Sequence, residues 1–274
     1  MFFIQSNQVD PGRHSGRGAL SIAWLAGLAV LIWDAIPLQA DVFTVTTASG
    51  RGADAYVQGS VPTSNFGSST VITTRDGPGN ASNVYKDYFR FDLSNSGFDL
   101  ANATSVTFSF VTLTARTGTG FGFYVVPDGQ PGDAAPSTTG WTELGITYDN
   151  APGNAASGTA TGFITASPGD ENGNFLSSVG TLSIDTTVAG TVSFSSAGLL
   201  AAVKGDSNGL LTIALLRTDP NGIVQVASKE NTGGYMFPTL QITASPVPEP
   251  GVVALTGLGL GCLVFITRRR QPGR

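Results

Sequence analysis

The sequence predicts an all-β fold: an antiparallel β-sandwich of jelly-roll type with one short helix. Two observations point to this class. Apolar and polar side chains alternate with a period of two in repeated runs between residues 42 and 244, which is typical of half-buried strands. Gly, Pro, Asn and Asp separate these runs, and the βαβ alternation of a nucleotide-binding fold is absent. About ten strands and one helical turn fit two packed sheets.

The expected strands follow one another in chain order with turn residues between them. The first is VFTVTTA at 42–48, and the most regular is VYKDYFRFDL at 84–93. The others are SVTFSFVTLTA at 105–115, FGFYVV at 121–126, GTLSIDTT at 180–187, TVSFS at 191–195, LLTIALLR at 210–217, IVQVAS at 223–228 and TLQITA at 239–244.

The pattern also predicts which side chains face the core. One face of strand 84–93 carries Tyr85, Phe89, Phe91 and Leu93, with Asp87 as the polar exception. The other face carries Lys86, Tyr88, Arg90 and Asp92. Strand 105–115 turns Val106, Phe108 and Phe110 inward. The phase then shifts to Val111 and Leu113, which predicts a β-bulge at that point.

Two connecting segments have distinct signals. DPNG at 219–222 combines Pro with Asn-Gly, a strong chain-reversal signal between two expected strands. SSAGLLAAVKG at 195–205 is the one segment with helix signals, and Gly205 closes it.

The composition excludes several kinds of chemistry. The lone histidine, His14, lies near the N-terminus, and the single cysteine, Cys262, lies in an apolar run near the C-terminus. The region between them, from 41 to 245, therefore cannot hold a Ser-His-Asp triad, a Cys-His pair or an ordinary zinc site. Charged residues make up only 12% of the chain, and the regular alternation argues against disorder.

Residues 41–245 are acidic. They contain eight of the 14 Lys and Arg residues and 16 of the 19 Asp and Glu residues, so their net charge is near minus eight. A domain of this charge has no electrostatic footprint for nucleic acid, and we expect no nucleic-acid partner.

The N-terminal segment predicts export. Arg13 and Arg17 precede an apolar run at 19–33, and a small residue, Ala40, follows it, which is the pattern of a secretory signal peptide covering residues 1–40. The expected mature start is Asp41. An uncleaved signal anchor is the alternative.

The C-terminal segment, 246–274, has the pattern of a second targeting signal. Residues 251–267 lack charge and would span about 25 Å as a helix, the short limit for a transmembrane helix, and a basic tail follows at 268–274. With VPEP before it (Val247, Pro248, Glu249 and Pro250), this order resembles the PEP-CTERM sorting signal of Gram-negative bacteria. The resemblance implies an exosortase and the inner membrane as partners, with processing near the PEP motif. A permanently anchored type I membrane protein is the alternative.

A second resemblance covers nearly all of residues 41–245. It rests on ADAYV at 53–57, NFG at 65–67, YFRFDLS at 88–94, WTELGITYDNAP at 141–152 and ASKEN with PTL between 227 and 240. In this order they resemble the DNRLRE family, β-sandwich domains related to carbohydrate-binding modules in secreted bacterial proteins. Ser195 stands where the family usually has an Asp opening the short helix, and either residue can cap a helix.

One segment offers a candidate glycan-binding platform: Trp141, Glu143, Tyr148 and Asn150. Sugar binders stack an aromatic face on a pyranose ring and add carboxylate or amide hydrogen bonds to its hydroxyls. The alternative is that Trp141 plugs the end of the sandwich and Glu143 satisfies a loop backbone.

Two acidic groups are candidates for other roles. GDENGN at 169–174 places Asp170, Asn172 and Asn174 on a tight turn, where their oxygens suit Ca²⁺, although such turns are common without an ion. Beyond this Ca²⁺ candidate we expect no cofactor. Glu230, Asp54 and Arg90 are expected to form a structural carboxylate–guanidinium cluster.

Together these patterns predict an exported protein that is not an enzyme. It would begin as a precursor tethered to the inner membrane and reach the cell surface or extracellular matrix. There the sandwich would act structurally or adhesively, with weak binding of extracellular polysaccharide. A lyase or glycosidase acting on matrix polysaccharide is the alternative, since a catalytic carboxylate pair needs only two acidic residues at the right separation.

Overall fold

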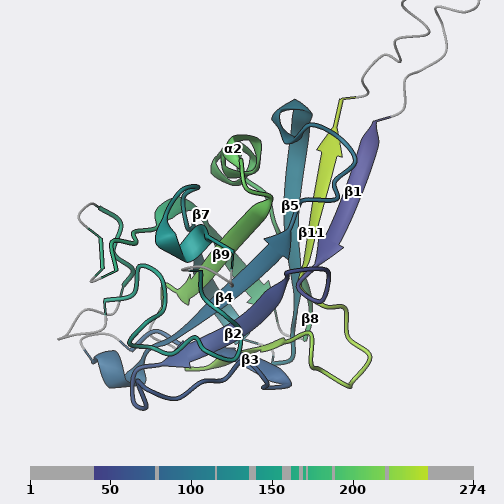
Figure 1. Cartoon of the computed structure of the whole chain (residues 1–274). Coiled ribbons are helices and arrows are strands. Elements are labelled where there is room, and N and C mark those ends of the chain that lie inside the picture. Colours follow the sequence, from purple (N-terminus) through teal and green to yellow (C-terminus); the bar gives the residue numbers. More distant parts are fainter. Residues whose placement is uncertain are drawn as a thin grey trace, which may run out of the picture. The chain divides into compact units, whose positions relative to one another are not determined.

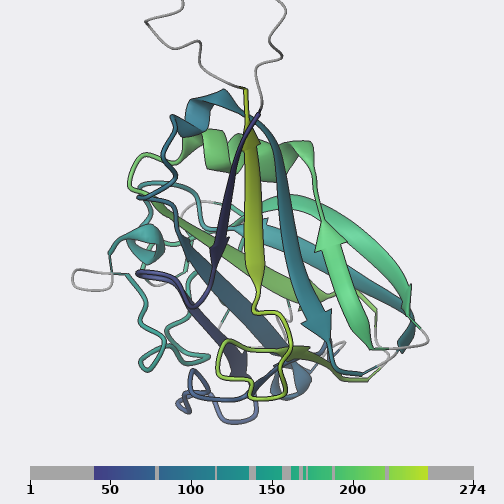
Figure 2. The same cartoon turned by 90° about the vertical axis from the view of Figure 1, so that its right-hand side faces the viewer.

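The alternating runs form two antiparallel sheets, which confirms the expected all-β class (Figures 1 and 2). The computed structural model describes residues 40–77, 80–114, 116–135, 140–155, 162–166, 169–170, 172–186, 189–219 and 222–245. In these ranges one sheet has six strands and the other has five, and one α-helix accompanies them. Two observed strands are absent from the sequence expectations: ADAYVQ at 53–58 and VITT at 71–74, whose four residues show too little alternation.

The six-stranded sheet contains both the first and the last strand. Its order is β1 (Asp41–Thr46), β11 (Thr239–Ala244), β5 (Ala103–Thr112), β10 (Val224–Ala227) and β3 (Val71–Thr74), and β8 (Gly190–Phe194) also pairs with β5. The order of the five-stranded sheet is β2 (Ala53–Gln58), β4 (Tyr85–Asp92), β9 (Leu210–Arg217), β6 (Arg116–Val125) and β7 (Ser177–Thr186).

Phenylalanine rings from both sheets meet in the main core. Phe108 of β5 lies 5.2 Å from Phe89 and 5.7 Å from Phe91 of β4, between ring centroids. Phe123 of β6 stacks on Phe194 of β8 at 3.9 Å. Asp87 shares this inner face, as the alternation predicts, and it is fully buried with neither carboxylate oxygen hydrogen-bonded. Burial raises the pKa of Asp87 well above its usual value.

A second apolar cluster covers the other face of the five-stranded sheet. In β4 the neighbours Tyr88 and Phe89 belong to different clusters, and successive side chains of a strand point to opposite faces. The members of the second cluster are Ala53, Ala55, Val57, Tyr88, Val126, Trp141, Ile146, Tyr148, Ala151, Leu176 and Ala214. Several come from the long segment between β6 and β7, so this segment forms a third layer over the sheet.

Two local expectations, the helix cap and the bulge, need correction. The helix α2 (Ala197–Gly205) is capped by Ser196, whose Oγ accepts from the Leu199 N–H, whereas Ser195 pairs with the Thr107 hydroxyl. The expected bulge after Phe110 is wrong, because β5 pairs regularly with β8 from 108 to 112 and its register shift lies near Ala103. The chain-reversal signal at 219–222 lies between β9 and β10, which belong to different sheets.

Three short 3₁₀ helices complete the described elements: Ala81–Asn83, Leu100–Asn102 and Pro131–Asp133. In the part of the chain that the structure describes, no helix has the length and apolarity needed to cross a membrane. The expected signal peptide (1–39 of it), the VPEP motif and the expected transmembrane helix at 251–267 lie outside the described residues.

Candidate carbohydrate-binding site

The outer face of β4 holds the third layer in place. Lys86 Nζ donates to Asn154 Oδ1 and to the Gly162 carbonyl, and the Tyr88 hydroxyl donates to the Pro152 carbonyl at 3.1 Å. Both side chains lie on the face that the alternation assigns away from the main core, and both are fully buried. Each therefore fixes one point of the segment between β6 and β7 to the sheet.

Arg90 fixes a third point, at Trp141. Its Nη1 donates to the Trp141 carbonyl, its Nε donates to the Arg51 carbonyl at 2.8 Å, and its guanidinium lies 4.5 Å from the Trp141 ring centroid. The indole Nε1 in turn donates to Thr212 Oγ1 of β9 at 3.2 Å. Burial lowers the pKa of Arg90 to about 10, which leaves it charged at neutral pH.

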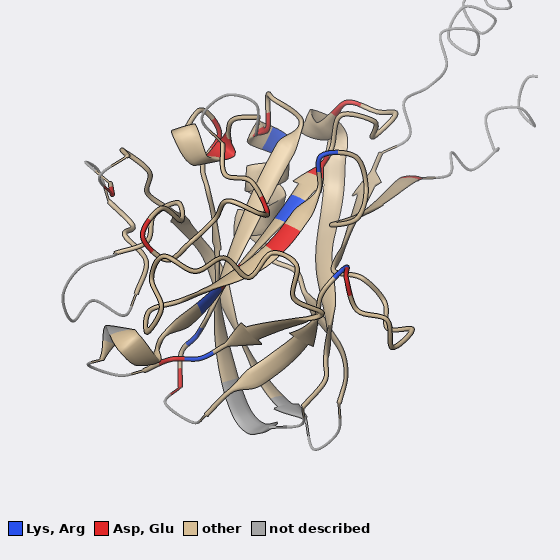
Figure 3. Ribbon diagram, turned by 60° about the horizontal axis from the view of Figure 1, so that its bottom comes forward, with Lys and Arg blue, Asp and Glu red and all other residues tan. Residues whose placement is uncertain are grey.

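The third layer contains an open hollow of about 530 Å³, here called the outer hollow. Its described wall combines residues from three stretches of the segment between β6 and β7. The lining residues are Pro131, Gly132, Gly140, Trp141, Thr142, Gly145, Ile146, Asn150, Pro152, Asn172 and Asn174. None of these residues carries a charge, although acidic residues recur on other loops of the domain (Figure 3).

The four predicted glycan-binding residues divide between this hollow and its surroundings. Trp141 and Asn150 line it, but Trp141 is 6% exposed and Tyr148 is 1% exposed, so both rings pack in the second apolar cluster. Glu143 accepts from the Asp54 N–H, a strand backbone group. This burial agrees with the packing alternative, and glycan binding by these four residues stays a prediction.

The acidic turn at 169–174 meets the same hollow. Asn172 and Asn174 line it. The Asp170 carboxylate accepts from the backbone N–H groups of Gly153, Asn172 and Asn174, and the Asn174 carbonyl oxygen Oδ1 accepts from Gly132 N–H. The turn thus ties loops together by hydrogen bonds, while Ca²⁺ binding at Asp170 stays a prediction. The sequence gives no signal that this turn and Trp141 share a hollow, because the two are not in one local motif.

The expected cluster of Glu230, Asp54 and Arg90 is confirmed for its two carboxylates but not for Arg90. Asp54 and Glu230 come together with Glu143, and the three carboxylates each have an oxygen within 4.8 Å of the others. The hydrogen bonds of Arg90 go to two carbonyls instead, because its side chain lies on the outer face of β4. The cation beside the carboxylates is Lys229, whose Nζ lies 2.7 Å from Glu143 Oε2. We call Asp54, Glu143 and Glu230 the carboxylate cluster.

The carboxylate cluster is partly desolvated. Asp54 is 1% exposed, and its Oδ2 accepts from the Thr47 hydroxyl at 2.6 Å and the Lys229 N–H at 3.0 Å. Burial raises the pKa of Asp54 to about 7, and the neighbouring Glu230 adds to this effect. Burial, together with Glu143, also raises the pKa of Glu230.

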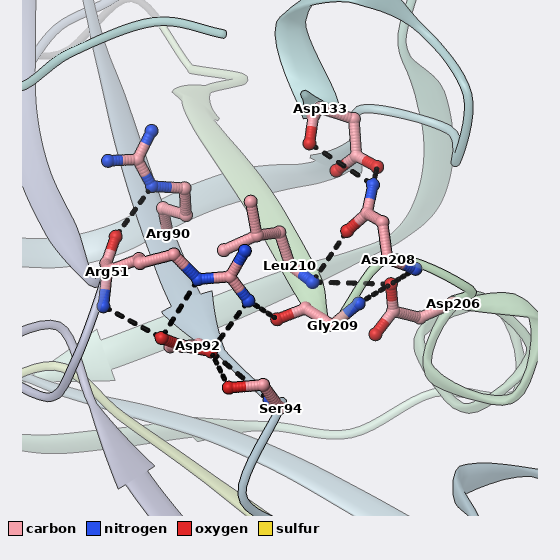
Figure 4. Close-up of polar contacts among 9 residues, drawn as sticks. All are labelled: Arg51, Arg90, Asp92, Ser94, Asp133, Asp206, Asn208, Gly209 and Leu210. Carbon is pink, nitrogen blue, oxygen red and sulfur yellow. Dashed lines mark hydrogen bonds and ion pairs between the residues drawn. The ribbon is translucent and has the colours of Figure 1, made fainter. Parts of the chain in front are cut away.

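A second hollow, of about 350 Å³, lies between α2 and the start of the third layer. Asp128, Asp133 and Asp206 line it, and Figure 4 shows the polar network behind the last two. Asn208 Nδ2 donates to Asp133 Oδ2, and Asp206 Oδ1 accepts from the backbone N–H of Gly209 at 3.1 Å. Burial raises the pKa of Asp133 to about 7, with Asp128 and Asp206 contributing.

The same network extends, through the Gly209 carbonyl, to the ion pair between Arg51 and Asp92. Arg51 donates to both carboxylate oxygens of Asp92 and to the Gly209 carbonyl, and the Ser94 hydroxyl donates to Asp92 Oδ1 (Figure 4). Burial alone would raise the pKa of Asp92, but these hydrogen bonds lower it below its usual value.

The fold is an antiparallel β-sandwich whose five-stranded sheet is covered by loops that line the outer hollow. Residues 45–175 of the chain match the sequence model of carbohydrate-binding module family 96. The match supports the expected relation to carbohydrate-binding modules, and it includes all the described residues that line the outer hollow. A search of curated proteins gives no significant match.

Proposed function

We propose that this protein is an exported carbohydrate-binding protein whose outer hollow binds an uncharged polysaccharide. The observation that carries the proposal is the position of the outer hollow inside the region that matches carbohydrate-binding module family 96. Its volume of about 530 Å³ falls in the range of about 300–1,000 Å³ that is usual for small-ligand sites.

The lining of the hollow supports an uncharged ligand. Amide and hydroxyl groups at Asn172 and Thr142 suit sugar hydroxyls, and Trp141 contributes to the lining, whereas the Asn150 amide is already hydrogen-bonded within its own loop. Among the residues that the structure describes, none in the lining carries a charge to pair with a carboxylated or sulfated sugar. The net charge of residues 41–245, near minus eight, also opposes an acidic polysaccharide.

The proposal also includes the export and sorting of the domain. The signal-peptide pattern at 1–40 and the VPEP motif with its apolar run and basic tail support export, tethering in the inner membrane and exosortase processing. The sandwich then acts at the cell surface or in the extracellular matrix of a Gram-negative bacterium, structurally or adhesively and without catalysis.

Binding is tested with the purified protein on an array of neutral and acidic glycans, followed by calorimetry on the best ligand. We expect a neutral ligand, and the double variant Thr142→Ala, Asn172→Ala should weaken it about tenfold, or about 1.4 kcal/mol. The matched control is Asn95→Ala, an exposed asparagine away from the hollow, which should bind like the wild type. No affinity for any glycan removes the binding proposal. Release of reducing ends or unsaturated sugars would show an enzyme instead.

Sorting is tested by the intact mass of the protein isolated from its native host. A mature C-terminus between Pro248 and Pro250 is the expected result, since exosortase cuts near the PEP motif. Retention of Arg274 would contradict processing and favour a permanent anchor.

A further inference from the structure

We propose that the carboxylate cluster, Asp54, Glu143 and Glu230, is a binding site for Ca²⁺. Each residue offers one carboxylate oxygen, and these oxygens all lie within 4.8 Å of one another. Ca²⁺ takes oxygen ligands at about 2.3–2.6 Å, so two ligands on opposite sides of one ion are separated by roughly 4.6–5.2 Å. A single ion can therefore contact all three carboxylates without a change of backbone.

A second observation, independent of this spacing, points to a missing ligand. Asp54 is 1% exposed, and its Oδ1 has no hydrogen-bond partner. Glu230 Oε2 is also buried and without a partner. A buried carboxylate oxygen without a partner costs free energy, and such exceptions need a physical explanation. A cation bound between the two side chains would satisfy both oxygens.

The charges around the cluster favour a divalent ion. Lys229 Nζ lies 2.7 Å from Glu143 Oε2 and 3.8 Å from Glu230 Oε1, and it is the cation that pairs with the cluster in the described structure. With all three carboxylates ionised, as binding of an ion requires, the Lys229 ammonium leaves two negative charges to be balanced. A divalent cation would balance them, and hard oxygen ligands select Ca²⁺ over softer metals.

Such an ion would join three segments that are distant in the sequence. Asp54 belongs to β2, Glu143 to the loop that follows Trp141, and Glu230 to the loop that follows β10. Asn65 Nδ2 already holds the middle loop by donating to the carbonyls of Glu143 and Ile146, both at 2.7 Å. The site is therefore largely formed before the ion binds, and binding should stabilise the whole domain.

The test is thermal unfolding of the full-length chain in mild detergent, first freed of metal with EDTA and then titrated with CaCl₂ or MgCl₂. We expect a saturable rise in Tm with CaCl₂, about 5–10 °C at a hundredfold excess over Kd, and a stoichiometry of one ion per chain in calorimetry. MgCl₂ should act more weakly, because Mg²⁺ requires a smaller octahedral site. The readout needs no glycan, so it is independent of the proposed function.

Variants assign the response to this cluster. Glu230→Gln, which is partly exposed and keeps the shape of the side chain, and Asp54→Asn should abolish the Ca²⁺ response. Lys229→Met should strengthen it, since a competing positive charge is removed. Asp149→Asn, an exposed residue of the same loop region, should leave it unchanged, as should Asp170→Asn in the acidic turn.

Several outcomes would overturn the proposal. They are the absence of any saturable response to CaCl₂, a response to MgCl₂ alone, and retention of the full response in Glu230→Gln. Loss of the response in Asp170→Asn, with Glu230→Gln unaffected, would move the ion to the acidic turn. If Asp54→Asn fails to fold, Glu230→Gln and the calorimetric stoichiometry still decide the question.

Discussion

Replacement of Asp133 by Asn should make the stability of the protein less sensitive to pH. Asp133 is 1% exposed, its Oδ1 has no hydrogen-bond partner, and the groups that face it are Asn208, Asp128 and Asp206. Its pKa is about 7 in the folded protein against an ordinary value of 3.8, because burial disfavours the charged form. The folded state therefore keeps a proton that the unfolded chain releases, and stability is lost as the pH rises from about 4 to about 7.

The magnitude follows from the size of the pKa shift. Roughly three pKa units correspond to about 4 kcal/mol, and water that reaches the carboxyl group through the second hollow reduces this to about 2–4 kcal/mol. The free energy of unfolding of Asp133→Asn minus that of the wild type should therefore increase by this amount between pH 4 and pH 8. The hydrogen bond from Asn208 can persist, since the amide oxygen also accepts.

The assay is urea unfolding of residues 41–245 at several pH values, followed by fluorescence. Trp141 is the only one of the three tryptophans in that fragment, so the signal reports on the third layer next to Asp133. Asn95→Ala is the control, and its difference from the wild type should not change with pH. A pH-independent difference for Asp133→Asn, or one that shrinks as the pH rises, would refute the reasoning.

Three further variants test other parts of the fold by the same assay. Phe108→Ala should destabilise the domain by about 3–5 kcal/mol because this buried ring packs on four others; a loss below about 1 kcal/mol would contradict the described core. Ser196→Ala should cost about 0.5–2 kcal/mol by removing the cap of α2, while Ser196→Thr should cost less. Burial lowers the pKa of Lys86 to about 7, so the folded protein releases this proton at a lower pH than the unfolded chain does. The free energy of unfolding of the wild type should therefore increase as the pH rises from about 7 to about 10.5, and Lys86→Met should lack this increase. An equal increase in the variant would contradict the interpretation.

Most of the strands could be predicted from the sequence because their physical cause is local, whereas those at 53–58 and 71–74 were missed. Alternation over the eight residues of β4 is enough to define its two faces, and it even placed Asp87 on the inner face. The pairing of strands depends on contacts between distant segments, so the sequence did not show that the 219–222 turn changes sheets. The cap of α2 moved by one residue for a similar reason: Ser196 is selected by its second bond, to the Val179 carbonyl of β7.

The candidate site was harder to predict because it is assembled by a layer whose described residues form no strand and no α-helix. Polar alternation normally indicates a face in water, yet Lys86 and Arg90 of that face are buried under the segment between β6 and β7. Their donors satisfy loop carbonyls that only the folded third layer brings near. The sequence could identify Trp141 as a large side chain in a motif. It could not show that the Arg90 guanidinium would lie over the Trp141 ring.

The residues that match family 96 contain the described lining of the outer hollow but only part of the carboxylate cluster. Residues 45–175 include β2, β4 and the described lining of the outer hollow, whereas Lys229 and Glu230 lie beyond it. The hollow and the three anchoring side chains of β4 therefore form one unit within the matched region. The carboxylate cluster, in contrast, joins that region to the loop after β10, since Asp54 and Glu143 come from one side and Glu230 from the other. Replacement of Glu230 should consequently change stability and the Ca²⁺ response more than it changes glycan binding. Replacement of Thr142 should weaken glycan binding more than it changes stability or the Ca²⁺ response.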